Sequence, residues 1–396
     1  MGEIVAEFSV MKPIRIGIVG IGNIGAFHTN NFLEGKVANV ELTAICDINP
    51  AALARFPNVK HFFRSEDLIR SGEIDGILIA TPHYFHTTIG IAALQQGLHV
   101  LVEKPISVHK ADCERLIAAH QNPKQVFAAM FDTRTEPRYI KLRELVQSGE
   151  LGQIKRINWI LTNWFRSDAY YASSNWRATW AGEGGGILVN QLPHDLDLLQ
   201  WIFGMPSRVR GFCGIGRYHD IEVEDEINAY LEYPNGATAL LTATTGEAPG
   251  TDRREVVGDR GRVIVHADRL EFTRTETPTS EFCRTTPQSF ATPGSWEISI
   301  PIHGKAGRHV EVIQRFVNAI QNGAPLVARA EEGIASVELA NAILYSSMTE
   351  QTVELPLDGA AYEAFLKTKI ATSRFRLHEP VAKAATSVDM GASFKH

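Results

Sequence analysis

The sequence predicts an α/β protein of two domains, the first built on a parallel sheet and the second, an α+β domain, on a large, open, mainly antiparallel sheet. Three observations support this prediction. Short apolar runs alternate with amphipathic segments over residues 11–134, which is typical of a parallel sheet covered by helices on both faces. Alternating polar and apolar segments then follow one another with turn signals between them, which indicates hairpins. The 396 residues are also enough for two or three domains of roughly 150 residues each.

Five runs in the first third are predicted strands because they are short, apolar and rich in β-branched residues. They are residues 14–20, 40–46, 76–81, 99–104 and 125–130. The segments between them have helical periodicity, as at residues 24–35 and 87–97. This alternation predicts a doubly wound domain.

The pattern changes after residue 135. A helix is predicted over 136–149, with Gly149 just beyond its last turn. The predicted antiparallel strands are residues 154–163, 207–216, 226–234, 237–245, 254–259, 262–267 and 269–274. Helical periodicity returns over 308–348. We therefore divide the chain into a first domain at 11–134, a second at 135–375, and a tail or arm at 376–396.

Composition excludes several classes of protein. Hydrophobic residues make up 44% of the chain and charged residues 21%, which argues against a disordered, collagen-like or coiled-coil protein. The net charge is 39 − 45 = −6, without a block of lysines and arginines. We therefore expect no binding to nucleic acid or to a membrane surface.

Cysteine usage and the N-terminus indicate a cytoplasmic protein. The four cysteines are far apart in the sequence, as in proteins of reducing compartments. Glu3 and Glu7 lie where a secretion signal needs basic and then apolar residues. No metal site is predicted, because His83 and His86 have no cysteine or carboxylate at metal-ligand spacing.

The motif Gly-Ile-Gly-Asn-Ile-Gly at residues 20–25 predicts a dinucleotide site, because it follows a buried strand and opens a helix. Gly20 permits a tight turn, Gly22 lets the backbone approach a pyrophosphate, and Gly25 allows the helix to pack closely on the strand. The amides of Asn23 and Ile24 are expected to face the phosphates. A glycine turn without a ligand is the alternative interpretation.

Asp47 favours NAD over NADP. It closes the next predicted strand, where a carboxylate accepts hydrogen bonds from both ribose hydroxyls and repels a 2′-phosphate. NADP sites usually place a small residue and an arginine there, whereas Asp47 is followed by residues 48–50, Ile-Asn-Pro, and the nearest arginine is Arg55. We expect NAD as the cofactor and NADP as the less favoured alternative.

Lys104 is a candidate catalytic residue because strand 99–104 ends in Glu103-Lys104-Pro105. The carboxyl edge of an open α/β sheet is where ligands bind, so Lys104 is placed to meet the nicotinamide end of the cofactor. Without that context, a solvated loop lysine beside a glutamate would be the better interpretation.

His194 is the second catalytic candidate. A glycine run at 184–186 leads into an apolar stripe of helical spacing, on which Asn190, His194 and Asp197 share another face. The glycines would let that face come close to a ligand. Histidine suits the transfer of a hydroxyl proton near neutral pH, although a lone histidine on a helix is more often structural.

Taken together, these motifs resemble the glucose-fructose oxidoreductase / inositol dehydrogenase (Gfo/Idh/MocA) family over nearly the whole chain. The features that carry the resemblance are residues 17–25 with Asp47, Ala80-Thr81-Pro82 followed by His86, Glu103-Lys104-Pro105, the glycine run before His194 with Asp197 after it, and the helical segment 309–347.

The resemblance implies an N-terminal Rossmann domain, and a C-terminal domain whose sheet forms a homodimer or homotetramer. It implies that Lys104 binds the reacting oxygen and stabilises its negative charge, that His194 is the general base in the oxidation direction, and that no metal takes part. The cofactor-facing residues that it implies, besides those of the glycine motif and Asp47, are Ala80, Thr81, Pro82, His83, His86, Glu103 and Lys104.

Two positions depart from the family pattern. Asn190 stands where many members similar to the inositol dehydrogenases have aspartate; asparagine can hydrogen-bond a substrate hydroxyl but cannot hold a negative charge. His83 stands where the family usually has asparagine, and it has either the same cofactor-facing role or none.

The segment 163–186 contains the substrate candidates, because it holds three of the six tryptophans, two adjacent tyrosines and two arginines. Aromatic faces beside hydrogen-bonding groups suit a sugar ring or cyclic polyol, while a packed aromatic patch between domains is the alternative. Trp176, Arg177 and Trp180 are the foremost candidates because they precede the catalytic helix. Arg166 and Arg177 could instead bind a phosphate or carboxylate.

The sequence therefore predicts an NAD-dependent oxidoreductase that takes hydride from a ring carbinol of a cyclic polyol, sugar or glycoside. Two alternatives remain open. The first is a lyase or glycosidase in which transient oxidation assists cleavage and NAD stays bound. The second is a sugar-sensing regulator of the same fold that does no chemistry.

Overall fold

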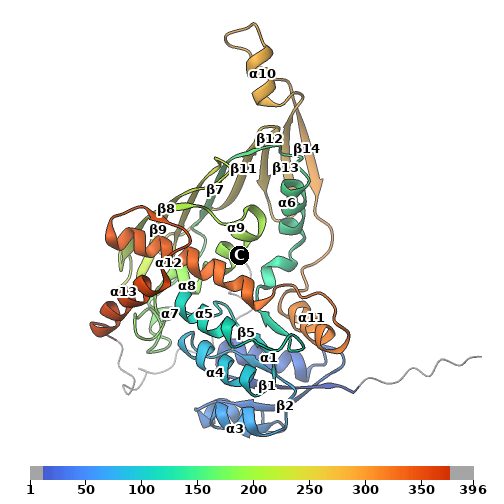
Figure 1. The fold of residues 1–396 in the computed structure, drawn as a ribbon, viewed down its shortest axis with the longest axis vertical. Helices are drawn as coiled ribbons and strands as arrows, with labels where there is room; N and C mark the ends of the chain where they lie inside the picture. The colour runs from blue at the N-terminus through green and yellow to red at the C-terminus, as the bar shows by residue number, and fades with distance from the viewer. Residues whose placement is uncertain (1–11, 375–396) are drawn as a thin grey trace, which may run out of the picture.

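A computed structural model describes residues 12–374, so the N-terminal segment and the tail predicted at 376–396 lie outside the described residues. The described chain forms two sheets with helices packed between and around them (Figure 1). No helix among residues 12–374 is long and apolar enough to cross a membrane.

The N-terminal sheet has six strands in the order β3-β2-β1-β4-β5-β6, and all its pairs are parallel. The strands are β1 (Ile14–Val19), β2 (Val40–Cys46), β3 (Lys60–Phe62), β4 (Gly76–Ile79), β5 (His99–Val102) and β6 (Phe127–Ala129). The five predicted strands are confirmed. Strand β3 was not predicted, because its three partly exposed residues carry no recognisable period.

Helices connect these strands on both faces of the sheet. They are α1 (Asn23–Leu33), α2 (Pro50–Leu53), α3 (Ser65–Arg70), α4 (Tyr84–Gln95), α5 (Lys110–Ala118) and, after β6, the 3₁₀ helix η1 (Asp132–Thr135). Because the strands are parallel, the loops that follow β1, β2, β4, β5 and β6 all leave the same edge of the sheet.

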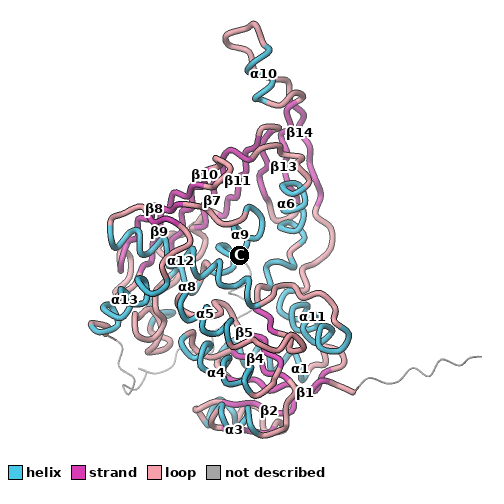
Figure 2. Tube along the Cα trace, viewed as in Figure 1, coloured by secondary structure: helices cyan, strands magenta, loops and turns pink. Residues whose placement is uncertain are grey.

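The second sheet has nine strands in the order β14-β13-β12-β11-β7-β10-β9-β8-β15. Figure 2 shows this sheet in magenta above the parallel sheet. They are β7 (Ile154–Leu161), β8 (Arg208–Ile215), β9 (Glu224–Glu232), β10 (Thr238–Thr244), β11 (Asp252–Gly258), β12 (Gly261–Val265), β13 (Arg269–Thr275), β14 (Ser295–Pro301) and β15 (Val353–Glu354). Its pairs are antiparallel except β10 with β7, which confirms the mainly antiparallel prediction. Strands β14 and β15 were not predicted.

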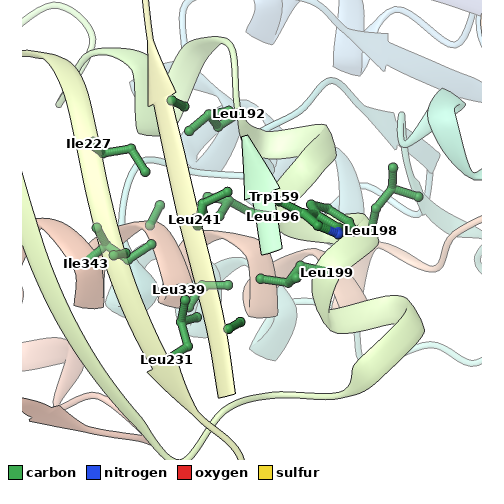
Figure 3. Packing of buried hydrophobic residues seen from close by; sticks show 14 of the residues in the cluster. Trp159, Leu192, Leu196, Leu198, Leu199, Ile227, Leu231, Leu241, Leu339 and Ile343 are labelled. Carbon is green, nitrogen blue, oxygen red and sulfur yellow. The ribbon is translucent and has the colours of Figure 1, made fainter. Parts of the chain in front are cut away.

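One face of this sheet is covered by helices and forms the larger core. Leu196 and Leu199 of α9 (Pro193–Phe203) belong to the same buried cluster as Leu241 of β10 and Leu339 of α12 (Gly333–Thr349) (Figure 3). The remaining helices of this part are α6 (Pro137–Gln147), α7 (Asp168–Tyr171), α8 (Ile187–Asn190), α10 (Thr279–Thr285), η2 (Ala330–Glu332) and α13 (Gly359–Ala371). The packing fixes α9 between the two sheets.

Helix α11 (Arg308–Asn322) returns to the N-terminal sheet, although the predicted boundary assigns it to the second domain. Its buried face, including Ile313 and Phe316, shares a hydrophobic cluster with Ile16 and Ile18 of β1. The segments within 135–375 are therefore not all packed together, and the N-terminus of α11 lies beside the Rossmann-type core.

Candidate active site

The glycine loop after β1 has the shape that a dinucleotide requires. Gly20 has φ +89°, and a Cβ atom on it would lie 2.6 Å from the Ala80 carbonyl oxygen. A Cβ atom on Gly25 would lie 1.8 Å from the Gly20 carbonyl oxygen. A Cβ atom on Gly22, by contrast, would meet nothing within 4 Å. Two glycines therefore allow close packing, while the middle one leaves an open surface.

The open surface lies at the N-terminus of α1. Gly22 caps this helix without a side-chain hydrogen bond, so the amides of Asn23 and Ile24 in the first turn are not capped by a side chain. Backbone N–H groups at a helix N-terminus favour an anion such as a phosphate. The loop thus has the chemistry of a pyrophosphate cradle.

Asp47 lies directly after β2 and contacts the glycine loop. Its Oδ2 atom accepts a hydrogen bond from the Ile21 amide at 2.6 Å, and its Oδ1 atom accepts one from the Asn49 amide at 2.8 Å. Arg55 donates to the Ile21 carbonyl oxygen on the same loop. The carboxylate therefore also holds the loop in place, a role that the sequence did not predict.

The segment after β4 lies next to the loop. Ala80 packs against Gly20, and the Thr81 hydroxyl is buried without a hydrogen-bond partner among residues 12–374. Such an orphaned group is expected where a ligand completes the site. Pro82 and His83 follow it, and burial together with nearby cationic groups holds the pKa of His83 well below its ordinary value. Together with the glycine loop, these residues fit a dinucleotide.

Two of the residues predicted to face the cofactor have buried side chains that bind other protein groups. His86 is fully buried, and its two ring nitrogens lie 2.8 Å from the Pro105 and Thr81 carbonyl oxygens. Glu103 is buried as well, with Oε1 at 2.7 Å from the ring of His28 on α1. The polar atoms of both side chains contact neighbouring protein groups, so both residues stabilise the ends of β4 and β5 from inside the domain.

Lys104 reaches from the end of β5 to the second domain. Its ammonium group donates a hydrogen bond to the Asn190 carbonyl oxygen at 2.9 Å. Burial lowers the pKa of Lys104, although Glu103, Asp132 and Glu183 act in the opposite direction. The ammonium is thus a partly desolvated donor between the domains, where its charge acts more strongly than in water.

His194 lies in the first turn of α9, and its side chain is only 11% exposed. Burial lowers its pKa to about 3, with Lys104 and His309 adding to the shift and Asp132 opposing it. The imidazole is therefore neutral at ordinary pH, which is the form that accepts a proton.

The helix predicted through Asn190, His194 and Asp197 is not continuous. It breaks between α8 and α9, because Pro193, which begins α9, has no amide hydrogen to continue the hydrogen bonds of α8. Asp197 also does not face the site. It is buried in a two-point ion pair with Arg134, at 2.7 Å for both contacts.

The substrate side of the site is a group of aromatic and amide side chains around Arg177. The guanidinium of Arg177 stacks on Tyr170 at 4.4 Å and on Trp176 at 4.7 Å, measured to the ring centroids. It donates to the Tyr170 hydroxyl at 2.6 Å, and that hydroxyl lies 3.3 Å from the Asn190 amide oxygen. The structure therefore brings the predicted residues Trp176, Arg177 and Asn190 together with Lys104.

Two other substrate candidates lie elsewhere. Trp180 is 5% exposed and belongs to the hydrophobic core of the second domain. Arg166 stacks on Trp164 and on Tyr170, which places it one aromatic ring away from Arg177. Its part in substrate binding stays a prediction.

The sequence predicts that the glycine run at 184–186 lets the helix face come close to a ligand. In the structure, the run packs against protein atoms instead. A Cβ atom on Gly184 would lie 2.1 Å from Val108, and one on Gly186 would lie 1.9 Å from the Glu224 carbonyl oxygen. The Glu224 carboxylate is buried beneath this run and accepts hydrogen bonds from the Gly186 and Leu188 amides at 2.8 and 3.2 Å. The run therefore allows α8 to pack closely against β9.

Three site residues were missed in the sequence. Glu183 is buried, accepts from the Ala178 amide at 2.6 Å and from the Asn190 side-chain amide, and burial raises its pKa. Asp132 follows β6 at the same sheet edge as Lys104, so the edge rule that found Lys104 could have found it. His309 lies on α11, and no sequence signal places that helix here.

Two family models match the chain. One described as an oxidoreductase family with an NAD-binding Rossmann fold matches residues 14–131. The other, described as a GFO/IDH/MocA C-terminal domain, matches residues 139–264. The matched segments meet near the end of η1, where the parallel sheet gives way to α6.

Two of the relatives that the chain matches are inositol dehydrogenases. Inositol 2-dehydrogenase of Corynebacterium glutamicum is 29% identical over 203 residues, which are 50% of this chain but only 56% of that protein. Myo-inositol 2-dehydrogenase of Thermotoga maritima is 24% identical over 354 residues, which are 86% of this chain and 98% of that protein. The chain thus spans little more than half of the first relative and nearly all of the second.

A solved structure shares the fold. The WlbA dehydrogenase from Chromobacterium violaceum, in complex with NADH and UDP-GlcNAcA, superposes with a TM-score of 0.75 at 24% identity. The superposition covers 88% of this chain and 98% of that one. The likeness therefore extends over both domains.

Proposed function

The chain belongs to the Gfo/Idh/MocA family of oxidoreductases, and from this premise we propose that it is an NAD-dependent dehydrogenase of ring carbinols in cyclic polyols, sugars or glycosides. One observation carries the proposal. Lys104 from the parallel sheet and His194 from α9 are far apart in sequence but interact electrostatically, and Lys104 also contacts Asn190, which the aromatic group around Arg177 reaches through Tyr170.

NAD fits the residues present. The first-turn amides of α1 would hold the pyrophosphate, and Asp47 would bind the adenosine ribose. The buried Thr81 hydroxyl would form a hydrogen bond with the bound dinucleotide. When bound, NAD supplies the acceptor for the hydride that leaves the carbinol carbon.

Lys104 would bind the substrate oxygen. One of its three N–H groups is directed to the Asn190 carbonyl oxygen, which leaves two donors for the reacting hydroxyl. As the hydroxyl becomes a carbonyl, negative charge develops on its oxygen, and a desolvated ammonium stabilises that charge more than water does. The expected contribution is on the order of a thousandfold in rate.

His194 would take the hydroxyl proton. Its imidazole is neutral across the working pH range, because its pKa is lowered to about 3. A neutral, buried imidazole accepts the proton while Lys104 binds the oxygen, so each residue acts on one atom of the same O–H group. Tyr170, Arg177 and Asn190 would bind the other ring hydroxyls.

The test combines a substrate panel with two variants. Inositols, hexoses and glycosides are incubated with NAD, and NADH formation is followed. Lys104→Met and His194→Gln are each expected to lower kcat on the preferred substrate about a thousandfold or more, while NAD affinity by calorimetry changes less than about threefold. Lys60→Met and His266→Gln, two partly exposed positions outside the site, serve as matched controls.

The outcomes are distinguishable. Near-normal rates in both site variants would exclude the proposal. Product formation without net NADH would instead favour cleavage assisted by transient oxidation. No turnover on the whole panel, with NAD and a sugar still bound, would favour a sensing role.

We also propose a homo-oligomer in the cytoplasm that assembles through the nine-stranded sheet. Phe212, Tyr230 and Leu240 on adjacent strands face away from the helices and are 57%, 40% and 47% exposed. Tyr230 and Leu240 are paired across their strands, and exposed aromatic and aliphatic side chains on one face of a sheet favour a subunit contact. Light scattering of the wild type and of Phe212→Asp tests this; a monomeric wild type would contradict it.

A further inference from the structure

Asp132 is a buried carboxylate beside His194 whose role the proposed function leaves open. It begins η1, directly after the end of β6, and is 1% exposed. Its Oδ1 atom has no hydrogen-bond partner within residues 12–374, but it lies 3.3 Å from Nε2 of His194. An ionised oxygen left unmatched in the interior costs free energy, so a charged or hydrogen-donating form of His194 is its natural partner.

The other oxygen of Asp132 is held by the start of α11. Arg308 Nη1 and His309 Nδ1 each lie 3.5 Å from Oδ2. Arg308 also pairs with Glu136 at 2.6 Å, and its amide donates to the Thr135 hydroxyl at 2.9 Å. Helix α11 is thus anchored to η1, and Asp132 is held between α11 and His194 of α9.

The surroundings keep Asp132 ionised. Burial by itself would raise its pKa, but His309, His194, Arg308 and Lys104 together hold the pKa below its ordinary value. An ionised carboxylate can only accept hydrogen bonds. Its negative charge, 3.3 Å from the His194 ring, therefore favours the protonated form of that ring.

We infer that Asp132 is a positioning residue for the reaction: it stabilises the positive charge that the His194 ring gains during oxidation. The inference rests on the proposed function. In the step, the substrate O–H bond breaks and its proton goes to the His194 imidazole, the C–H bond breaks with its electron pair passing to NAD, and the carbon becomes a carbonyl carbon. Asp132 itself neither gains a proton nor touches the substrate.

Other buried carboxylates near α9 do not fill this role, because each has a different partner. Asp195 pairs with Arg254 at 2.6 Å, and Asp197 pairs with Arg134. Glu103 pairs with His28. Asn190, which has no charge, binds Glu183 rather than His194. Asp132 thus supplies the carboxylate that Asn190 cannot provide.

The experiment measures ketone reduction with NADH, because that direction requires His194 to be protonated. Besides Asp132, the groups that face His194 are Lys104 and Glu103 from the end of β5 and His309 from α11. In Asp132→Asn the carboxylate is lost but the shape is kept, so kcat is expected to fall about 10- to 100-fold at pH 7 with little change in KM for NADH. The pH at which the rate is halved should also move down by about one unit.

Asp132→Glu keeps the charge and is expected to restore the pH profile, though not the full rate. Asp268→Asn, at an exposed position, is the matched control. A kcat within twofold of the wild type and an unchanged pH profile in Asp132→Asn would overturn the inference, provided that His194→Gln is inactive. If His194→Gln is fully active, the proposed function itself fails.

Discussion

The two glycine clusters of this chain, at 20–25 and 184–186, look alike in sequence but have different surroundings. In the first, the middle glycine faces open space at the start of a helix. In the second, Cβ atoms would collide with Val108 and with the Glu224 backbone. Glycine can therefore make room either for a ligand or for the protein's own packing, and only the surrounding atoms decide between the two.

A carboxylate braces each cluster, and these also differ. Asp47 accepts the Ile21 amide from a partly exposed position and can still meet a ligand. Glu224 accepts the Gly186 and Leu188 amides from full burial, and burial raises its pKa to about 7. The first carboxylate serves binding and the second serves the fold.

The largest effect is expected for Gly186→Ala. Its Cβ atom would lie 1.9 Å from a backbone oxygen of β9, which cannot move away without disturbing the sheet. We expect a loss of more than about 3 kcal/mol in the free energy of unfolding, or no folded protein. Thermal unfolding measures this. A variant as stable as the wild type would show that the second cluster does not serve packing.

The next effect is the pH dependence that Glu224 confers. The pKa of Glu224 in the folded protein is about 7, which is above the ordinary pKa of a glutamate. Its protonated carboxyl group therefore contributes fully to stability when the pH is below that ordinary pKa, and this contribution is lost as the pH rises from there through 7. Glu224→Gln removes this loss, so its stability relative to the wild type should rise by about 1–3 kcal/mol between pH 4.5 and 8. Urea unfolding at several pH values measures this, with exposed Glu354→Gln as the control. Parallel curves for both proteins would contradict the role.

Gly22→Ala should have the opposite profile to Gly186→Ala. Its Cβ atom meets no protein atom within 4 Å, so stability should change by less than about 0.5 kcal/mol. The same methyl group occupies the surface proposed for the pyrophosphate, so NAD affinity should fall tenfold or more, which is about 1.4 kcal/mol. Calorimetry with NAD measures this, and unchanged affinity would remove the loop from the binding site.

The smallest effect is expected for Asp47→Ala. The loop loses one bracing contact, and the ribose loses its proposed acceptor, so NAD binding should weaken several-fold while NADP binding stays the same or improves. Competition between the two dinucleotides measures the ratio. An equal loss for both would show that Asp47 only braces the loop.

The sequence by itself determined the parts of this protein that are local. Strand and helix periods lie within short segments, and so do the glycine motif, Asp47 at the end of its strand and the Glu103-Lys104-Pro105 turn. These features could be predicted because a parallel sheet brings the carboxyl ends of its strands to one edge whatever the rest of the chain does. Asp132 obeys the same rule, but nothing in its neighbours distinguished it.

Only the tertiary structure decided which side chains face one another across the domains. His309 reaches Asp132 because α11 packs on the first domain, more than 170 residues after η1. Trp180 and His86 are buried because their neighbours cover them, which their residue types did not reveal. Burial and long-range pairing depend on atoms distant in sequence, whereas strand periods and turn motifs depend on atoms nearby. The cofactor half of the site could therefore be predicted from motifs, while the contact between Asp132 and the proposed base could be found only in the fold.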